Sequence, residues 1–426
     1  MGAYKGLPVR RDVAEALIDQ GLTVLRYGGP MINHPEYRWK KMIGPREQRP
    51  PHRNTWYPYS SNGWGIPDFL AFCEAAGFLA IPAFNMDETP GEMADFAEYA
   101  NGPADSTWGA RRAADGHPEP FGLRHIELGN EERVDDSYFA KFAPLAEAIW
   151  ARDPQTIVGV GDFVYGQPIA DPLKVEGAAS GIRSLAAHQR ILQLAQAHGR
   201  EVWFEVHVGT DGPRPDATFG ALFSYLDALT KLADGAKFKV VVFEFNAGNH
   251  TQKRALANAL ALNALERDGR VPVAVSANAL QPYGQNDNGW DQGLLFLNQS
   301  QVWLHPPGWV TRMVSTNYQP RHVPVDVSDD AGLGVCAARS ADGKVLVVRV
   351  VNVGDRPVPA ALRLEGFAPS KPVAHVEELT APLDARNTAD DPTTVQPHVT
   401  DWQHEFAHGE VRRVFLAHGF TVVRFE

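Results

Sequence analysis

Apolar, β-branched segments alternate with amphipathic helical segments through about three quarters of the chain, and this alternation limits the possible folds more than any other feature. The strand-like segments begin near Leu22, Phe78, Leu123, Thr156, Glu201, Phe238 and Val271. The segments between them have the 3.6-residue apolar period of helices, as at residues 66–77, 138–153, 182–199 and 252–269. A strand, helix, strand order repeated in this way predicts a parallel sheet.

Polar residues gather directly after the predicted strands. They include Asn85, Asn130, Glu131, His207 and Glu244. In a (β/α)8 barrel, that end of the strands is the catalytic face. A doubly wound open sheet is the main rival, but no Gly-x-Gly-x-x-Gly segment follows the first strand and no Walker-type loop occurs. We therefore expect a TIM-type (β/α)8 barrel.

The barrel has one visible difficulty, because only seven strands can be found. The first strand is not evident, and residues 1–9 are a weak source for it. An unpaired barrel edge could be covered by a second copy of the chain, so a homo-oligomer is left open.

The pattern changes near Ser315, where helical periodicity stops. Short alternating segments follow, separated by turn-like sequences such as residues 340–344 and 352–357. This pattern predicts an antiparallel β-sandwich. We expect a catalytic barrel at residues 1–314 and a C-terminal sandwich at residues 315–426.

Charge and cysteine content narrow the class of protein. The net charge of -11 argues against nucleic acid or an anionic membrane as a partner. The two cysteines, Cys73 and Cys336, fall in different predicted domains and are expected to be buried thiols. No apolar signal-peptide core and no run of about 18 apolar residues occurs. The sequence as given predicts a cytoplasmic protein, or a secreted one if a signal peptide was removed.

Two glutamates carry the predicted chemistry. Glu131 follows the segment 123–130, and Glu244 closes the apolar run 240–243. An Asn-Glu pair after a strand can also be a helix cap, but a charged residue ending an apolar run is costly unless it has a partner or a function. Retaining glycosidases hold two carboxyls about 5 Å apart. We assign Glu131 as the acid/base and Glu244 as the nucleophile.

Neighbouring polar and aromatic residues have two possible roles each. His207 is either a structural residue or a hydrogen-bond partner of the nucleophile. Arg26 is either an ion pair in the barrel floor, with Glu205 or Glu127, or a brace for the nucleophile carboxylate. Asn246 lies two residues beyond Glu244, on the same strand face. Trp290 offers a flat ring for stacking on a sugar, although large aromatics more often serve packing.

One metal motif is present but lies in the wrong context. Residues 404–408 match His-Glu-x-x-His, which on a helix binds zinc. This stretch lies in a polar segment of the predicted sandwich and ends at Gly409, and no third ligand is evident. We predict no metal and no cofactor.

Taken together, these motifs resemble glycoside hydrolase family 51, the family of α-L-arabinofuranosidases and some endo-β-1,4-glucanases and xylanases. The segments that carry the resemblance are residues 25–29, 37–39, 44–50, 102–103, 116–120, 129–131, 244–246, 301–306, 379–388 and 421–423. The resemblance implies a barrel with a β-sandwich and a retaining mechanism, with the acid/base after strand four and the nucleophile after strand seven. The expected substrate-binding residues are Arg26, Trp39, Asn85, Asn130, His207, Asn246, Trp290 and Gln301.

Several departures from the family pattern bear on the substrate. The family's first strand and the N-terminal part of its sandwich are absent, Met31 replaces a polar residue, Gly209 stands in place of a tyrosine, and Gly248 replaces a tryptophan. Losing bulky walls would open a pocket toward a cleft. We therefore expect endo-action on β-1,4-glucan or xylan slightly more than arabinose release by an α-L-arabinofuranosidase.

Two readings from other classes stay open at this point. The first is a catalytically inactive carbohydrate-binding protein, against which the retention of both glutamates argues. The second is a nucleotide-dependent α/β enzyme, for which no phosphate loop is present.

Overall fold

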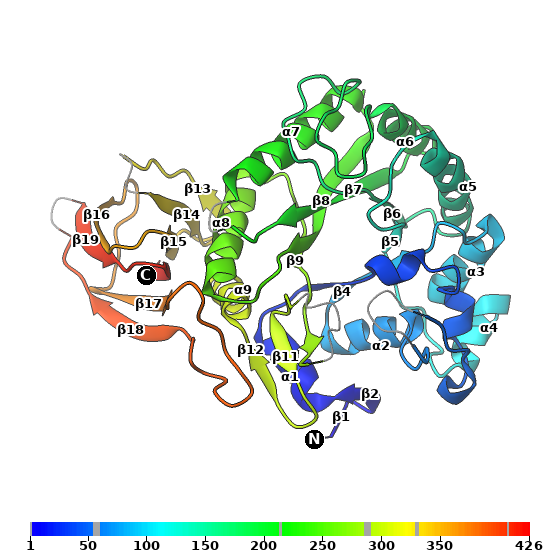
Figure 1. Cartoon of the computed structure of the whole chain (residues 1–426), viewed down its shortest axis with the longest axis horizontal. Coiled ribbons are helices and arrows are strands. Elements are labelled where there is room, and N and C mark those ends of the chain that lie inside the picture. The colour runs from blue at the N-terminus through cyan, green and yellow to red at the C-terminus, as the bar shows by residue number, and fades with distance from the viewer. Residues whose placement is uncertain (1, 54–59, 213–214, 285–290, 329–331, 407–408) are drawn as a thin grey trace.

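The chain folds into a helix-surrounded barrel with antiparallel sheets beside it. The computed structural model describes residues 2–426 except 54–59, 213–214, 285–290, 329–331 and 407–408. Figure 1 shows the barrel strands ringed by helices, and the antiparallel sheets, in orange and red, beside α8 and α9. The expected combination of a barrel with antiparallel sheets is confirmed.

Seven parallel strands form the barrel in their order along the chain. Each pairs with the next in parallel register, in the order β3-β4-β5-β6-β7-β8-β9. Their bounds are β3 (Val24–Tyr27), β4 (Leu79–Phe84), β5 (His125–Leu128), β6 (Ile157–Gly161), β7 (Glu201–Gly209), β8 (Lys237–Asn246) and β9 (Ala274–Ser276).

The helices alternate with the barrel strands, and capping residues mark the ends of some of them. Thr89 and Glu92 form a reciprocal capping box at the start of α3, and Gly77 ends α2 with φ 81°. The bounds are α1 (Arg11–Asp19), α2 (Ile66–Ala76), α3 (Pro90–Asn101), α4 (Thr107–Ala114), α5 (Asp136–Arg152), α6 (Ala186–Ala197), α7 (Asp216–Leu232), α8 (Gln252–Asp268) and α9 (Pro306–Thr316). Short 3₁₀ helices lie at Pro30–Asn33, Trp39–Met42 and Arg46–Gln48.

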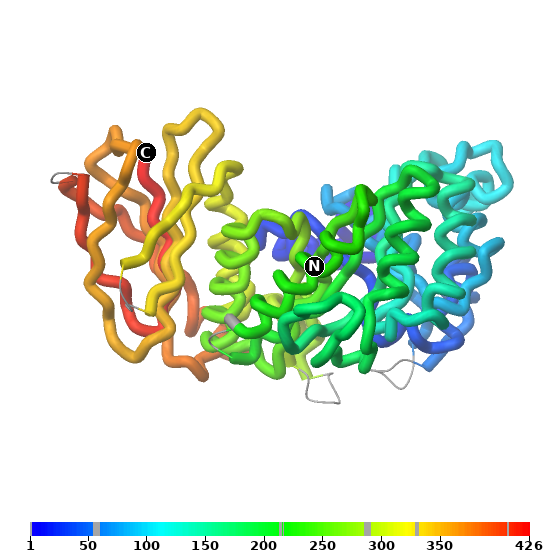
Figure 2. Tube along the Cα trace, turned by 90° about the horizontal axis from the view of Figure 1, so that it is seen from above, coloured from blue at the N-terminus to red at the C-terminus, as the bar shows by residue number. Residues whose placement is uncertain are grey.

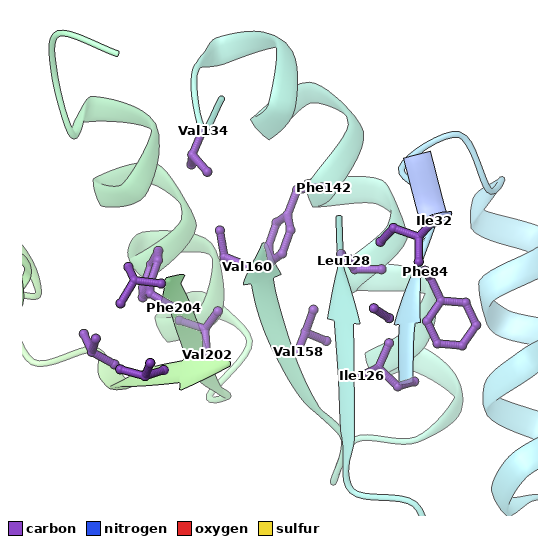
Figure 3. Packing of buried hydrophobic residues seen from close by; sticks show 14 of the residues in the cluster. Ile32, Phe84, Ile126, Leu128, Val134, Phe142, Val158, Val160, Val202 and Phe204 are labelled. Carbon is purple, nitrogen blue, oxygen red and sulfur yellow. The ribbon is translucent and has the colours of Figure 1, made fainter. Parts of the chain in front are cut away.

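The main apolar core lies between the strands and the surrounding helices. Val158 and Val160 of β6 and Val202 and Phe204 of β7 are fully buried there, as is Phe142 of α5. Figure 3 shows these valines and Phe204 projecting from the strands toward the helices, where Phe142 of α5 meets them. This packing holds the strands in a fixed frame, so that the residues at their ends are positioned by a rigid support.

The interior of the barrel changes character along its axis. Ile81, Trp203, Val241, Phe243 and Val273 form a small apolar cluster inside the ring of strands. Charged residues occupy the interior nearer the C-terminal ends of the strands. The apolar cluster therefore closes the barrel on one side of a polar chamber.

The two ends of the strand order leave the barrel incompletely closed. Within the described residues, β3 pairs only with β4 and β9 only with β8. Residues near the N-terminus form a separate hairpin, β1 (Ala3–Tyr4) with β2 (Leu7–Arg10), and not an eighth barrel strand. A groove of about 1100 Å³ runs between β3 and β9 and is lined by both. The predicted cover by a second chain stays a prediction.

Antiparallel sheets make up the C-terminal part. A six-stranded sheet has the order β13-β14-β15-β20-β17-β18, and β16 pairs with β19. The strands are β13 (Arg321–Val323), β14 (Leu333–Arg339), β15 (Leu346–Asn352), β16 (Val358–Arg363), β17 (Val373–Thr380), β18 (His398–Gln403), β19 (Glu410–Phe415) and β20 (Gly419–Phe425). Val411 and Phe415 of β19 share a core with the larger sheet. The division at residues 314 and 315 stays a prediction.

A second apolar cluster joins the two parts. Leu256 of α8 and Met313 of α9 pack against Val347, Val351 and Phe420 of the six-stranded sheet. Figure 2 shows these helices between the barrel and the sheets.

A third small sheet consists of β10 (Gln281–Pro282), β11 (Leu295–Leu297) and β12 (Val302–Leu304). In the described residues, no helix is long and apolar enough to span a membrane.

Candidate active site

Glu131 lies in a tight loop directly after β5. Gly129 has φ 88°, and Glu131 itself has φ 54°, in the left-handed region that non-glycine residues rarely adopt. Strained backbone of this kind costs of order 1–3 kcal/mol and is often found at functional sites. The loop keeps Asn130 fully buried, while the Glu131 side chain stays 29% exposed. The backbone therefore presents the Glu131 carboxyl at the open end of the barrel.

A β-bulge in β8 positions Glu244. Val242 pairs with Val206 and Glu244 with His207, so Phe243 has no partner residue on β7. A bulge inserts one residue and changes the direction of the following side chains. Without it, the register would place Phe243 opposite His207. The bulge thus brings Glu244 beside His207 in the interior of the barrel.

Arg26 connects the nucleophile candidate to the floor of the site. Its Nε and Nη2 atoms each donate to the carboxylate of Glu127 at 2.6 Å, and its Nη1 donates to Glu244 Oε1 at 2.6 Å. Nη2 also donates to Asn130 Oδ1 at 2.7 Å and lies 3.9 Å from Glu205. Arg26 therefore has both of the roles considered from the sequence, a buried ion pair and a contact with the Glu244 carboxylate.

His207 lies between the two glutamates that were singled out. Its Nδ1 atom is 3.0 Å from Glu131 Oε1 and 3.5 Å from Glu244 Oε2. Its Nε2 atom is 3.3 Å from Glu205 Oε2. The ring is fully buried and meets Phe163 edge to face. One imidazole thus links both carboxyls at the mouth of the site to a third carboxyl beneath them.

The charges of this cluster shift its pKa values. Burial alone would lower the pKa of His207, but the carboxylates of Glu205 and Glu244 outweigh it and hold that pKa well above its usual value. Burial would raise the pKa of Glu244, but His207 and Arg26 keep it below the usual value. Burial raises the pKa of Glu127 to about 8 against the opposing effect of Arg26. His207 is therefore a cation and Glu244 an anion at neutral pH.

The spacing of the two carboxyls defines what the site can do. Carboxylate oxygens of Glu131 and Glu244 lie within 4.8 Å of each other and of a ring nitrogen of His207. Carboxyls about 5 Å apart suit a retaining glycosidase, whereas inverting enzymes separate them by roughly 6.5–9.5 Å. The same donor set could surround a cation, but Arg26 and His207 already balance these carboxylates, so we assign no metal.

Two of the expected substrate-binding residues lie beside the carboxyl pair. Asn246 Nδ2 donates to Glu244 Oε2 at 2.9 Å. Asn130 accepts from Arg26, and its buried Nδ2 has no hydrogen-bond partner among the described residues. Together with Arg26 and His207, they make four of the eight expected residues that the structure brings together.

The remaining expected residues do not join this cluster. Trp39 is fully buried among Phe96, Tyr99 and Trp108, so its ring packs in the core away from the carboxyl pair, and its substrate-binding role stays a prediction. The side-chain amide of Asn85 is already hydrogen-bonded within the protein. It donates to the Ile32 and His34 carbonyls and accepts from the Asp87 amide.

Gln301 and Trp290 complete the set. Gln301 is exposed in the turn between β11 and β12, where it contacts Asn298 and the Ala389 carbonyl. These contacts hold a turn, and none involves the carboxyl pair. Trp290 lies outside the described residues, so its predicted stacking role stays a prediction.

The His-Glu-x-x-His segment has no helical geometry where it is described. Residues 404–406 follow the end of β18 and are not helical, and His408 lies outside the described residues. His404 packs against the rings of Trp402, Phe406 and Phe425. His404 is therefore part of the apolar core of the sheets.

Comparisons with known proteins agree with this geometry. A model of the alpha-L-arabinofuranosidase 1 domain matches residues 16–165, and one of the alpha-L-arabinofuranosidase C-terminal domain matches residues 242–417. The chain belongs to glycoside hydrolase family 51. The resemblance stated from the motifs is thereby confirmed.

Relatives of this family 51 chain are known at the level of both sequence and structure. An extracellular exo-alpha-L-arabinofuranosidase from Streptomyces chartreusis is 35% identical over 183 residues, covering 35% of this chain and 22% of that protein. Alpha-L-arabinofuranosidase A from Aspergillus niger is 25% identical over 391 residues, covering 85% of this chain and 57% of that protein. The chain thus spans only part of the length of these curated relatives.

A solved structure supports the fold over the whole chain. The alpha-L-arabinofuranosidase from Thermotoga maritima, solved as an arabinose complex, matches with a TM-score of 0.79 at 22% identity. The match covers 99% of this chain and 92% of that one. The barrel with its antiparallel sheets is therefore the family 51 architecture.

Sequence reasoning missed how deeply the charged network of this family 51 chain extends. Glu127 and Glu205 were considered only as possible partners of Arg26, yet both are fully buried beneath the carboxyl pair. Glu205 lies two residues before His207 on the same strand face, and Glu127 lies three residues before Asn130, at the end of β5. A charged residue inside an apolar strand was the available signal.

Proposed function

We propose that this chain is a retaining glycoside hydrolase, with Glu244 as the nucleophile and Glu131 as the acid/base. The observation that carries the proposal is the carboxyl pair, with oxygens within 4.8 Å of each other at the open end of the barrel. That spacing lets one carboxyl reach the anomeric carbon while the other reaches the leaving oxygen. Membership of family 51 supports the same assignment.

The reaction has two steps. Glu244 attacks the anomeric carbon, the glycosidic C–O bond breaks, and Glu131 gives its proton to the leaving oxygen. Water then attacks the same carbon and breaks the ester with Glu244, while Glu131 takes a proton from the water. The lowered pKa of Glu244 keeps it ionised for the first step. Asn246 donates to Oε2 of this carboxylate, which leaves Oε1 in contact with Arg26.

The substrate best supported is a terminal α-L-arabinofuranosyl group. The relatives reported above carry the name α-L-arabinofuranosidase, and none of them supports the endo-glucanase or xylanase reading. That reading assumed that Gly209 and Gly248 leave the pocket open. However, Asp211 Oδ1 accepts from the Gly248 amide at 2.5 Å and from Asn249 Nδ2 at 3.2 Å. These hydrogen bonds hold the loops after β7 and β8 together, at the place where the family pattern has bulky side chains and this chain has glycines.

A buried amide is available to orient the sugar. Asn130 Nδ2 has no partner among the described residues although the side chain is fully buried. An unpaired buried donor costs about 1–3 kcal/mol. Its position next to Glu131 gives a sugar hydroxyl a place to accept that hydrogen bond. We assign Asn130 to this role together with Asn246 and His207.

The test compares an aryl α-L-arabinofuranoside with soluble β-glucan, xylan and arabinan. We expect release of the aryl group and of arabinose, with the anomeric configuration retained when the products are followed by NMR. Glu244→Ala should abolish turnover, and added azide should restore a slow reaction that yields an inverted glycosyl azide.

Each alternative outcome has a distinct meaning. A fast fall in the viscosity of glucan or xylan, absent in Glu244→Ala, would restore the endo-acting reading. Binding of arabinan without turnover would favour a binding protein. Full activity in both Glu131→Ala and Glu244→Ala would refute the assignment of the pair.

A further inference from the structure

Glu205 is a fully buried carboxylate that the two-step reaction does not use. It lies on β7 two residues before His207, so both side chains project from the same face of the strand. Glu205 Oε2 is 3.3 Å from His207 Nε2, and Oε1 is 3.9 Å from Arg26 Nη2. Neither oxygen has a hydrogen-bond partner among the described residues. The charged side chains of His207 and Arg26 are the groups that compensate this carboxylate.

Such a residue is expensive for the fold. The effective penalty for burying an ion is several kcal/mol, and replacing a buried ion pair by apolar side chains is often neutral or stabilising. The apolar residues Trp203 and Val241 occupy the interior next to it. Removing Glu205 alone would instead leave the buried charges of His207 and Arg26 less compensated, so the role of this carboxylate lies in its two charged neighbours.

We propose that Glu205 is a positioning residue, which keeps His207 doubly protonated and directs its Nδ1–H toward both Glu131 and Glu244. This inference rests on the proposed glycosidase function. During the first step, negative charge leaves Glu244 as its ester forms and develops on Glu131 as it loses its proton. A fixed imidazolium at 3.0 Å from Glu131 and 3.5 Å from Glu244 stabilises the charge at both ends of that transfer.

The charge of the ring depends on every group that surrounds it. The pKa of His207 is held well above its usual value against the effect of burial. The groups facing or neighbouring the ring are Glu205 on β7, Glu131 and Glu127 from β5 and its loop, Glu244 on β8, Arg26 on β3 behind Glu205 and Glu244, and the uncharged ring of Phe163 after β6. Glu205 is the carboxylate among them that contacts Nε2.

The experiment uses Glu205→Gln in the full chain, which removes the charge and keeps the shape. We expect the titration of His207 to move to lower pH by about one to three units, the usual effect of an opposite charge at this distance. It is followed by the ¹³Cε1 NMR signal that disappears in His207→Gln. The alkaline limb of kcat/KM should move in the same direction, while activity on the acid side is largely kept. Glu205→Asp should restore part of both shifts.

Asp162→Asn is the matched control, because Asp162 is also a buried carboxylate in contact with a histidine, His188, at 2.7 Å. It should move neither the His207 signal nor the alkaline limb. If Glu205→Gln does not fold, Glu205→Met tests the same loss of charge.

An unmoved His207 titration in a folded Glu205 variant would overturn the inference. So would a loss of rate that is equal at all pH values and equal in Asp162→Asn, since that pattern reports structure alone. A wild type that hydrolyses no glycoside would refute the proposed function and the inference with it. In an active enzyme, an unmoved limb refutes the inference only.

Discussion

Two buried carboxylate–histidine pairs lie near each other in the barrel, one formed by Asp162 after β6 and His188 of α6, the other by Glu205 and His207 of β7, and they are satisfied in different ways. Asp162, just after β6, accepts hydrogen bonds from the hydroxyls of Tyr165 and Tyr225, both at 2.8 Å, and from the Phe163 amide at 2.8 Å, with His188 at 2.7 Å. Glu205 on β7 has contacts with His207 and Arg26 but no hydrogen bond among the described residues.

The difference separates a structural anchor from a chemical site. Every oxygen of Asp162 has a donor, and the two tyrosines have pKa values raised well above normal, mainly by burial and then by Asp162, so they stay neutral donors. Such a network fixes the loop after β6 and satisfies both oxygens of Asp162, although Nδ1 of His188 has no hydrogen-bond partner among the described residues. The Glu205 cluster instead keeps an unpaired amide, at Asn130, and two carboxyls at its open end. The unpaired Asn130 amide beside two carboxyls leaves a hydrogen-bond donor where a ligand can reach them.

The largest expected effect concerns the Glu205 cluster, through the Glu131 carboxyl at its open end. Glu131→Ala should reduce kcat/KM by about 10²–10⁴-fold on an arabinofuranoside with an alkyl leaving group, because general acid catalysis contributes that much. On a dinitrophenyl arabinofuranoside, whose leaving group needs no proton, the loss should be far smaller. Steady-state rates on both substrates give the ratio.

Asp162→Asn is the control for this comparison and should leave the ratio of the two rates unchanged. Equal losses on both substrates in Glu131→Ala would mean that Glu131 is not the acid.

The Asp162 cluster should behave in the opposite way: a substitution there should have a large effect on stability and little effect on the pH profile of activity. Asp162→Ala removes one partner of a buried pair and leaves three donors without an acceptor. We expect a loss of about 3–5 kcal/mol in the free energy of unfolding, measured by urea denaturation. The enzyme that stays folded should keep its pH profile. A loss below about 1 kcal/mol would show that the network is not the anchor described here.

The barrel and its carboxyl pair could be predicted because strand-end residues of parallel strands meet on one face. Seven segments with strand character, and a glutamate at the end of two of them, were enough to place Glu131 and Glu244. The bulge at Phe243 could not be predicted, since one added residue leaves no local pattern, yet it sets the direction of Glu244.

Roles that depend on packing were the least predictable. Trp39 lies in a motif shared with the family, but its ring is covered by Trp108 and residues of α3, segments far away in the chain. Asn85 follows a strand as a site residue would, but the loop at residues 32–34 uses its amide. Sequence position shows which face a residue is on and does not show what else reaches it.

A third histidine sharpens the contrast with His207 by having no acid beside it. His305 is buried against Phe296 and His250, and neither ring nitrogen has a partner in the described part of the chain. Burial lowers the pKa of His305 to about 2, from 6.5. The unfolded chain therefore binds a proton below pH 6.5 that the folded chain does not. Stability from this residue is complete above pH 6.5 and falls as the pH drops.

Between pH 6.5 and pH 5, this residue should lower the free energy of unfolding by about 2 kcal/mol, at 1.36 kcal/mol per pH unit. His305→Phe keeps the ring and removes the titration, so its stability should fall less over this range than that of the wild type. Urea denaturation at the two pH values measures the difference. Parallel losses in both proteins would show that His305 is not held neutral by burial.

The smallest expected effect concerns a single hydrogen bond of the Asp162 cluster. Tyr165→Phe removes one of the donors to Asp162 and keeps the ring stacked on Tyr225, whose centroid is 4.3 Å away. Because the Tyr225 hydroxyl and His188 still contact the same oxygen, the carboxylate stays solvated by the protein. We expect the free energy of unfolding to fall by about 1 kcal/mol, with no change in kcat/KM at any pH. A shift of the pH profile in this variant would mean that the two carboxylate–histidine pairs are electrostatically coupled, and the separation between anchor and site would then be wrong.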